Sequence, residues 1–179
     1  GDRVKDWTTH NEPMVVVDGE YLYQFHYPKL VDGKKAVQVA YNLNIASAKA
    51  IAKFKELGLD KDGGRIGTIL NLTPTYSASN SKEDLAAAHF AELWNNKMFL
   101  EPAINGEFPK ELEEILTNDG VIWQTELGDS DILKANTVDF LGVNFYHPNR
   151  VKAPDIAPNS VGDWLPNRYY DEYKMPGRR

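Results

Sequence analysis

The residues best suited to chemistry lie near the start of the sequence, in the run Trp7-Thr8-Thr9-His10-Asn11-Glu12-Pro13. A carboxyl such as that of Glu12, at a strand end among aromatic and apolar groups, is favoured in its protonated form and can act as an acid near neutrality. Asn11 offers donor and acceptor groups that can hold a hydroxyl. An isolated Asn-Glu-Pro tripeptide is more often a surface glutamate after an Asx turn. The strand and the tryptophan before it favour the catalytic interpretation.

A second polar pair follows another strand-like run, Val138 to Phe145. Asn144 and Tyr146 are two residues apart, so on a strand their side chains point to the same side. An amide and a phenol facing one side of a site can orient a carboxylate or a sugar. The alternative for this pair is a buried tyrosine that ties down a loop.

The other polar residues predict no metal or cofactor. The four histidines lack the spacing of a metal motif, and we interpret them as packing or surface residues. The acidic cluster Glu126, Asp129 and Asp131 lacks the spacing of a calcium loop, so a solvated loop is predicted there. Without cysteine, the chain has no disulfide, thiol nucleophile or cysteine-based zinc site. A net charge of −6 with interleaved signs argues against a nucleic-acid partner.

The bulk properties predict one soluble domain. The 179 residues are enough for a hydrophobic core. No apolar stretch approaches the roughly 18 residues of a membrane helix, and no membrane partner is expected. The sequence shows no signal-peptide pattern and no cysteine, which fits a cytoplasmic location. Because it begins with Gly1 rather than Met, we interpret residues 1–179 as one incomplete fragment of a longer catalytic protein.

Strand-like runs alternate with helical patterns. Nearly continuous apolar runs are typical of buried parallel strands, and strands are predicted over residues 4–9, 65–72 and 138–145. Helices are predicted over 36–57 before Gly58, over about 81–99 with Ser81 and Asp84 as a cap, and over 110–118. Loops are predicted over 14–33, 73–80 and 148–179. This order indicates an α/β fold with a parallel sheet.

Polar residues gather where each predicted strand ends, at Asn11-Glu12, Thr73 to Tyr76 and Asn144 to Tyr146. In barrels of alternating strands and helices, that end carries the active site. Such a barrel takes about 250 residues. The sequence therefore predicts a partial TIM (β/α)8 barrel of about three strands.

The run from Trp7 to Pro13 resembles a pattern of glycoside hydrolase family 1, Trp-any-Thr-any-Asn-Glu-Pro, which lies on the fourth strand of that family's barrel. Further blocks resemble the family in the same order: Tyr41 to Leu43, Ile66 to Pro74, Phe99 to Pro102, Gly106 to Pro109 and Asp139 to Tyr146. The resemblance is closest to bacterial 6-phospho-β-glucosidases, through His10, the loop Tyr21 to His26 and the block Met175 to Arg179. It implies about strands four to six of the barrel.

The resemblance also implies roles. Glu12 would be the acid/base, which protonates the leaving oxygen and later deprotonates the water that resolves a glycosyl-enzyme intermediate. Asn11 would bind the 2-hydroxyl of the sugar, and Tyr146, with Asn144 beside it, would contact the nucleophilic carboxylate. The family's nucleophile lies in a Thr-Glu-Asn-Gly block that this sequence lacks. The parent is thus expected to be a retaining β-glycosidase acting on 6-phospho-β-glucosides, and this chain alone is expected to be inactive.

A non-catalytic sugar-binding or scaffold module that stands alone is the alternative function. In either case, a third of a barrel leaves two sheet edges open, and open edges favour pairing with another chain. We therefore expect self-association along those edges.

Overall fold

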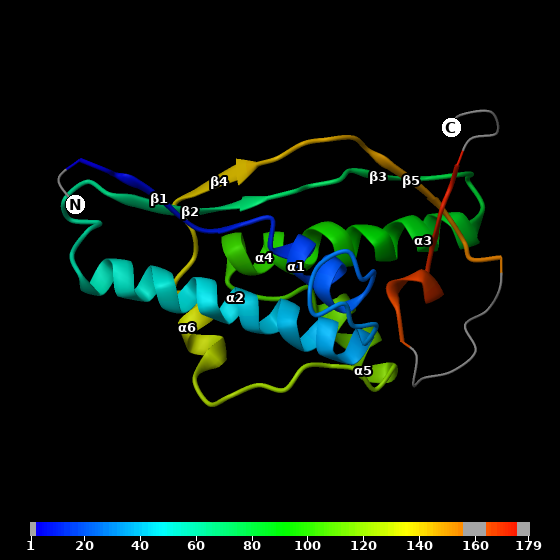
Figure 1. The fold of residues 1–179 in the computed structure, drawn as a ribbon, viewed down its shortest axis with the longest axis horizontal. Helices are drawn as coiled ribbons and strands as arrows, with labels where there is room; N and C mark the ends of the chain where they lie inside the picture. The colour runs from blue at the N-terminus through cyan, green and yellow to red at the C-terminus, as the bar shows by residue number, and fades with distance from the viewer. Residues whose placement is uncertain (1–2, 156–163, 175–179) are drawn as a thin grey trace.

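The computed structural model describes residues 3–155 and 164–174, and the block Met175 to Arg179 lies outside them. Two three-stranded sheets follow one another along the molecule, and the helices lie on one side of them (Figure 1). The other side of the main sheet carries no helix in the part of the chain that the structure describes. The predicted α/β class is confirmed.

The main sheet has the strand order β1-β2-β4, and both of its pairs are parallel. Its strands are β1 Asp6–Asn11, β2 Arg65–Leu70 and β4 Phe140–Val143. The three strands predicted from the sequence are all present, with bounds shifted by no more than two residues. Strand β1 contains a bulge, because Thr8 pairs with Gly67 whereas Asn11 pairs with Ile69. Three steps along β1 thus match two along β2.

A second sheet continues two of these strands. It contains β3 Thr75–Ser77, β5 Asn149–Lys152 and β6 Asp171–Glu172, with β3 parallel to β5 and β6 antiparallel to it. Since β3 follows β2 and β5 follows β4, the same two runs of chain pair twice (Figure 1). The prediction of loops over 73–80 and 148–179 was wrong at these strands, because strands of two to four residues carry too few side chains for a visible alternation.

Three predicted helices are confirmed. Helix α2 spans Gly33–Glu56 and ends before Gly58, whose φ of 70° suits glycine. Helix α3, Lys82–Glu92, begins at Ser81, whose hydroxyl accepts the backbone N–H of Asp84 at 3.1 Å. Helix α5 spans Lys110–Asn118, as predicted.

The helix predicted to end near Phe99 continues further. A π-helical turn, Leu93–Lys97, joins α3 to α4, Met98–Asn105. Pro102 lies inside α4 and conceals this continuation in the sequence. The π turn brings Asn96 against the end of β2, where its side-chain amide bonds both the N–H and the carbonyl of Thr73.

Two helices were not predicted. Helix α1, Pro13–Tyr21, replaces the first part of the loop predicted over 14–33. Its β-branched valines have low helix propensity, but Pro13 at its first turn fixes a helical φ. Helix α6, Asp129–Ala135, replaces part of the predicted acidic loop. Asp129 is buried there because it accepts from the Tyr41 hydroxyl at 2.7 Å and from the Glu126 N–H at 2.9 Å.

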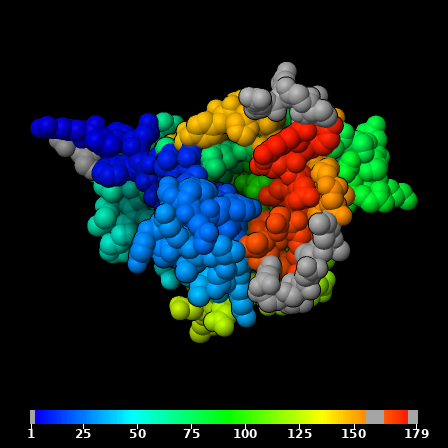
Figure 2. Space-filling model, turned by 45° about the vertical axis from the view of Figure 1, so that its right-hand side comes forward, coloured from blue at the N-terminus to red at the C-terminus, as the bar shows by residue number. Residues whose placement is uncertain are grey.

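The segment from residue 164 to 174 is packed rather than solvent-exposed, which corrects the prediction of a surface loop. Trp164 is 2% exposed and contacts Trp94 edge-on. Its indole N–H and the Tyr169 hydroxyl both donate to Asp119 just after α5, at 2.7 and 2.6 Å. Figure 2 shows this segment, in red, lying against the orange strand β5. It includes the short 3-10 helix Pro166–Arg168.

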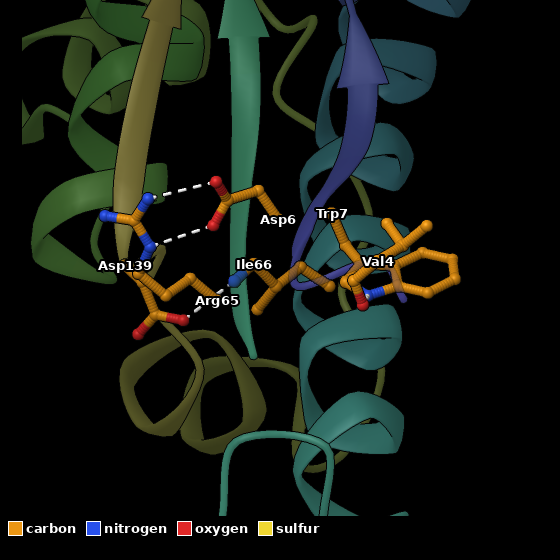
Figure 3. Close-up of polar contacts among 6 residues, drawn as sticks. All are labelled: Val4, Asp6, Trp7, Arg65, Ile66 and Asp139. Carbon is orange, nitrogen blue, oxygen red and sulfur yellow. Dashed lines mark hydrogen bonds and ion pairs between the residues drawn. The ribbon is translucent and has the colours of Figure 1, made fainter. Parts of the chain in front are cut away.

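The amino-terminal ends of the main-sheet strands are tied by charged side chains (Figure 3). Arg65 on β2 forms two hydrogen bonds with Asp6 on β1, at 2.9 and 3.1 Å. Asp139, just before β4, accepts the backbone N–H of Ile66 at 2.8 Å. These bonds set the register of all three strands at the end opposite Glu12.

The core lies between the sheet and the helices. The main hydrophobic cluster contains residues from different elements, among them Val17, Val37, Leu70, Trp94 and Leu112. A smaller cluster of Ile51, Phe54 and Ile66 fixes α2 against β2. No helix within the described residues is long and apolar enough to cross a membrane.

Asp18 on α1 gives a pH-dependent stability. Burial raises the pKa of this carboxyl from 3.8 to about 7. Because the folded-state pKa lies above the unfolded one, the protonated form is stabilised: the stability is fully present below about pH 4 and is lost as the pH rises through 7. Replacing Asp18 with Asn should raise the free energy of unfolding at pH 8 by roughly 2–4 kcal/mol, and little at pH 4.

Thermal unfolding at both pH values measures this difference, with Asp60→Asn at an exposed position as the matched control. Equal effects of Asp18→Asn at pH 4 and pH 8 would contradict the prediction.

Strands β1 and β4 are the edges of the main sheet, since each pairs only with β2 among the described strands. Trp7 and Val143 are 41% and 51% exposed there. We expect sedimentation velocity to show self-association that increases with concentration, because unpaired N–H and C=O groups on an edge pair with another chain. Val143→Lys should weaken it, whereas Leu127→Lys, at an exposed leucine away from both sheets, should not. A monomer at high concentration contradicts this expectation.

Candidate functional site

The site begins where β1 ends. The Glu12 N–H donates to the Ile69 carbonyl at 2.8 Å, which extends the pairing with β2 by one residue. Glu12 itself has φ 51° and ψ 56°, in the left-handed region, and the chain turns there into α1. A non-glycine residue in this region costs about 1–3 kcal/mol, and such residues are enriched at functional sites. Because the chain turns at Glu12, its side chain no longer follows the alternation of β1.

The bulge in β1 decides which side chains face the helices. The Thr9 hydroxyl lies 2.8 Å from that of Ser47 on α2. His10 lines a cavity of about 10 Å³ together with Ser47, Asn44 and Thr68. Burial lowers the pKa of His10 and so favours its neutral form. Thr9 and His10 thus both point beneath the sheet, and Asn11 and Glu12 are left at its open end.

All four residues predicted from the sequence meet there. The side-chain amide of Asn144 donates to Asn11 Oδ1 at 3.1 Å and to Glu12 Oε1 at 2.8 Å. The Tyr146 hydroxyl also donates to Glu12 Oε1. Since neighbouring strands are about 4.8 Å apart, groups that follow β4 reach groups that follow β1 only by leaning over the end of β2. Asn144 and Tyr146 therefore lie on one side of the sheet, as their spacing predicts.

The electrostatics of the cluster are those of a carboxyl held by neutral donors. The hydrogen bond to Glu12, with smaller effects of desolvation and of the nearby charge, raises the pKa of Tyr146 above 10. Glu12 and Asn144 are half-buried, while Tyr146 is 67% exposed. Such a carboxyl can exchange a proton with a group that approaches from the open side.

Sequence reasoning found the side chains of the site but missed the backbone groups that fix them. The Asn144 N–H donates to the Leu70 carbonyl at 2.9 Å, as the Glu12 N–H does to Ile69. Backbone acceptors leave no signal in a sequence. No group of three or more potential metal ligands occurs within residues 3–155 and 164–174. A cavity of about 700 Å³ between α2 and α6 is lined by residues that do not belong to this cluster.

The main sheet is parallel, has helices on one side, and carries a carboxyl and amides at the carboxyl ends of its strands. This arrangement is typical of part of an α/β-barrel enzyme. The model of glycosyl hydrolase family 1 matches residues 1–171. The chain belongs to this family.

Curated relatives cover almost the whole chain. It is 51% identical over 179 residues to the 6-phospho-beta-glucosidase GmuD of Bacillus subtilis, which covers 100% of this chain and 38% of the relative. It is 36% identical over 174 residues to a 6-phospho-beta-galactosidase of Clostridium acetobutylicum, covering 91% of this chain and 36% of the relative. The chain thus spans somewhat more than a third of the length of these relatives.

Solved structures show the same relation. A beta-glucosidase from Exiguobacterium marinum matches with a TM-score of 0.78 and 26% identity, over 99% of this chain and 38% of that one. A family 1 glycoside hydrolase of Thermotoga maritima, complexed with a cyclophellitol analogue as a transition-state mimic, matches with a TM-score of 0.78 and 30% identity, over 98% and 36%. The fold described here is therefore similar to part of these larger chains.

The contact between Tyr146 and Glu12 gives a prediction for the chain itself. Because the acceptor raises the pKa of Tyr146, Glu12→Gln should return this pKa toward 10. The titration of ring-labelled tyrosines by NMR measures the shift. Glu107→Gln, at an exposed carboxylate paired with Lys134, serves as the control and should leave Tyr146 unchanged. If Tyr146 titrates identically in both variants, the contact is absent in solution.

Proposed function

We propose that this chain is the acid/base-bearing part, about strands four to six, of a retaining β-glycosidase that hydrolyses 6-phospho-β-glucosides. The meeting of Glu12 with Asn144 and Tyr146 at the carboxyl ends of β1 and β4, in a member of glycosyl hydrolase family 1, carries the proposal. The substrate class rests on the relative named 6-phospho-beta-glucosidase, at 51% identity.

In this proposal Glu12 acts first as a general acid and then as a general base. Its carboxyl first protonates the oxygen of the leaving group, while a second carboxylate attacks the sugar and forms a glycosyl-enzyme intermediate. The Glu12 carboxylate then takes a proton from the water that releases the sugar. Retention requires the second carboxylate about 5–5.5 Å from the first. We propose that a part of the protein outside this chain supplies it, on the open side of the sheet.

Asn11, Asn144 and Tyr146 complete the proposed half-site. Asn11 binds a sugar hydroxyl, Tyr146 orients the carboxylates, and Asn144 supports substrate binding through its contacts with Asn11 and Glu12. The neutral donors around Glu12 suit an acid/base, because the carboxyl must carry a proton in one step and release it in the next. A fixed cation beside it would oppose the protonated form.

The decisive variant is Glu12→Gln in the whole protein. With a phenyl 6-phospho-β-glucoside, whose leaving group needs protonation, kcat/KM should fall by roughly 10²–10⁴-fold. With the 4-nitrophenyl analogue, whose leaving group departs readily as an anion, the first step should fall far less. Steady-state and burst kinetics on both substrates measure this difference. Equal losses on the two substrates would contradict the acid role.

The isolated chain provides the control. It should not turn over either substrate, because it lacks the family's nucleophile block. Turnover by a preparation free of full-length enzyme would overturn this part of the proposal. Saturable binding of a phosphorylated glucoside by the monomeric chain, measured by calorimetry, would instead favour the alternative of a stand-alone sugar-binding module.

A further inference from the structure

Both amide hydrogens of the Asn144 side chain are donated to other residues of the site. An asparagine amide has two N–H donors on one nitrogen. Here Nδ2 lies 3.1 Å from Asn11 Oδ1 and 2.8 Å from Glu12 Oε1, so one hydrogen serves each neighbour. The Asn144 backbone N–H is itself fixed on the Leu70 carbonyl at 2.9 Å. The Asn144 side-chain amide is therefore held between Asn11 and Glu12, the two residues before α1. Its backbone is held by the bond to Leu70.

The first consequence concerns Asn11. Because its Oδ1 accepts from Asn144, the oxygen of this amide is turned toward β4 and its Nδ2 is turned away from it. Within the described residues, Asn11 Nδ2 donates no hydrogen bond. Asn11 thus presents a donor, rather than an acceptor, to whatever enters the open side.

The second consequence concerns Glu12. Asn144 and Tyr146 both donate to Oε1. A carboxylate oxygen has two lone pairs, and both are used when it accepts two hydrogen bonds. A proton on Oε1 would then face two donors, so the exchangeable proton belongs on Oε2. No side chain in the described ranges donates to Oε2.

We propose that Asn144 is a positioning residue that fixes Asn11 with its amide N–H groups toward the substrate and Glu12 with Oε2 as the proton-carrying oxygen. This inference rests on the proposed function and deepens it. It predicts that the sugar must offer an acceptor, such as a hydroxyl oxygen, opposite Asn11. It also predicts that Asn144 acts through Asn11 and Glu12 rather than independently of them.

The test uses the whole protein and two substrates, a phenyl 6-phospho-β-glucoside and its 2-deoxy analogue. Asn144→Ala should lower kcat/KM on the first substrate by roughly 10²-fold, because a misplaced acid/base loses about that much. It should also reduce the preference for the 2-hydroxy substrate to that of Asn11→Ala. The double variant should show no further loss of this preference.

The isosteric variant Asn144→Asp adds a second readout. It exchanges both donors for a carboxylate, which favours the protonated form of its neighbour. The alkaline limb of the kcat/KM profile should therefore move to higher pH. Asn80→Asp, the same change at an exposed position, should leave the profile unchanged. If both Asn144 variants keep the wild-type substrate preference and pH limb, the inference is overturned.

A readout without turnover separates this inference from the proposed function. In the isolated chain, NMR of the side-chain amides should show Asn11 held in one orientation, and Asn144→Ala should release it. If the wild-type whole protein hydrolyses neither substrate while Asn11 is released as expected, the proposed function fails and the positioning role stands. If Asn11 is unaffected by Asn144→Ala, the positioning role fails whatever the activity.

Discussion

The hydrogen bond from the Glu12 N–H to the Ile69 carbonyl is the contact on which the rest of the site depends. It holds Glu12, the residue after β1, on β2 beyond the bulge that shifts the register by one. A backbone hydrogen bond contributes about 0.5–1.5 kcal/mol net, which offsets part of the roughly 1–3 kcal/mol that the left-handed conformation of Glu12 costs. Without it, the turn into α1 would have no fixed starting point, and the carboxyl would have no fixed position relative to β4.

Close packing on the helix-free face brings the three strands together. A Cβ added at Gly67 would lie 2.4 Å from the Phe140 carbonyl oxygen, and one at Gly142 would lie 2.8 Å from the Ile69 side chain. Glycine is therefore required on β2 and on β4, because any side chain would push the strands apart. At this close spacing, Asn144, beyond β4, reaches Glu12 across the end of β2.

The sequence predicted the strands of the main sheet and its parallel arrangement, and it singled out four polar residues whose side chains meet in the structure. Long apolar runs and the Asn-Glu-Pro motif are local signals. The prediction failed where structure depends on distant partners. Asp129 reads as a solvated acid until Tyr41, 88 positions away, is seen to donate to it. Trp164 reads as part of a proline-rich loop until Asp119 is seen to accept its indole N–H. Helix α1 was missed because valines oppose helix formation locally, while the burial of Val17 in the core favours it.

The two ends of the main-sheet strands carry different kinds of contact: charged pairs at the amino-terminal end and the candidate site at the carboxyl-terminal end. At the amino-terminal end, the hydrogen bonds from Arg65 to Asp6, with a smaller effect of the opposite charge, lower the pKa of Asp6 and join β2 to β1. At the carboxyl-terminal end, the only partners of Glu12 among the described side chains are neutral donors. A cation there would hold the carboxyl permanently charged. Neutral donors fix the position of the carboxyl without placing a fixed charge beside it. A group that transfers protons in a reaction needs such a fixed position.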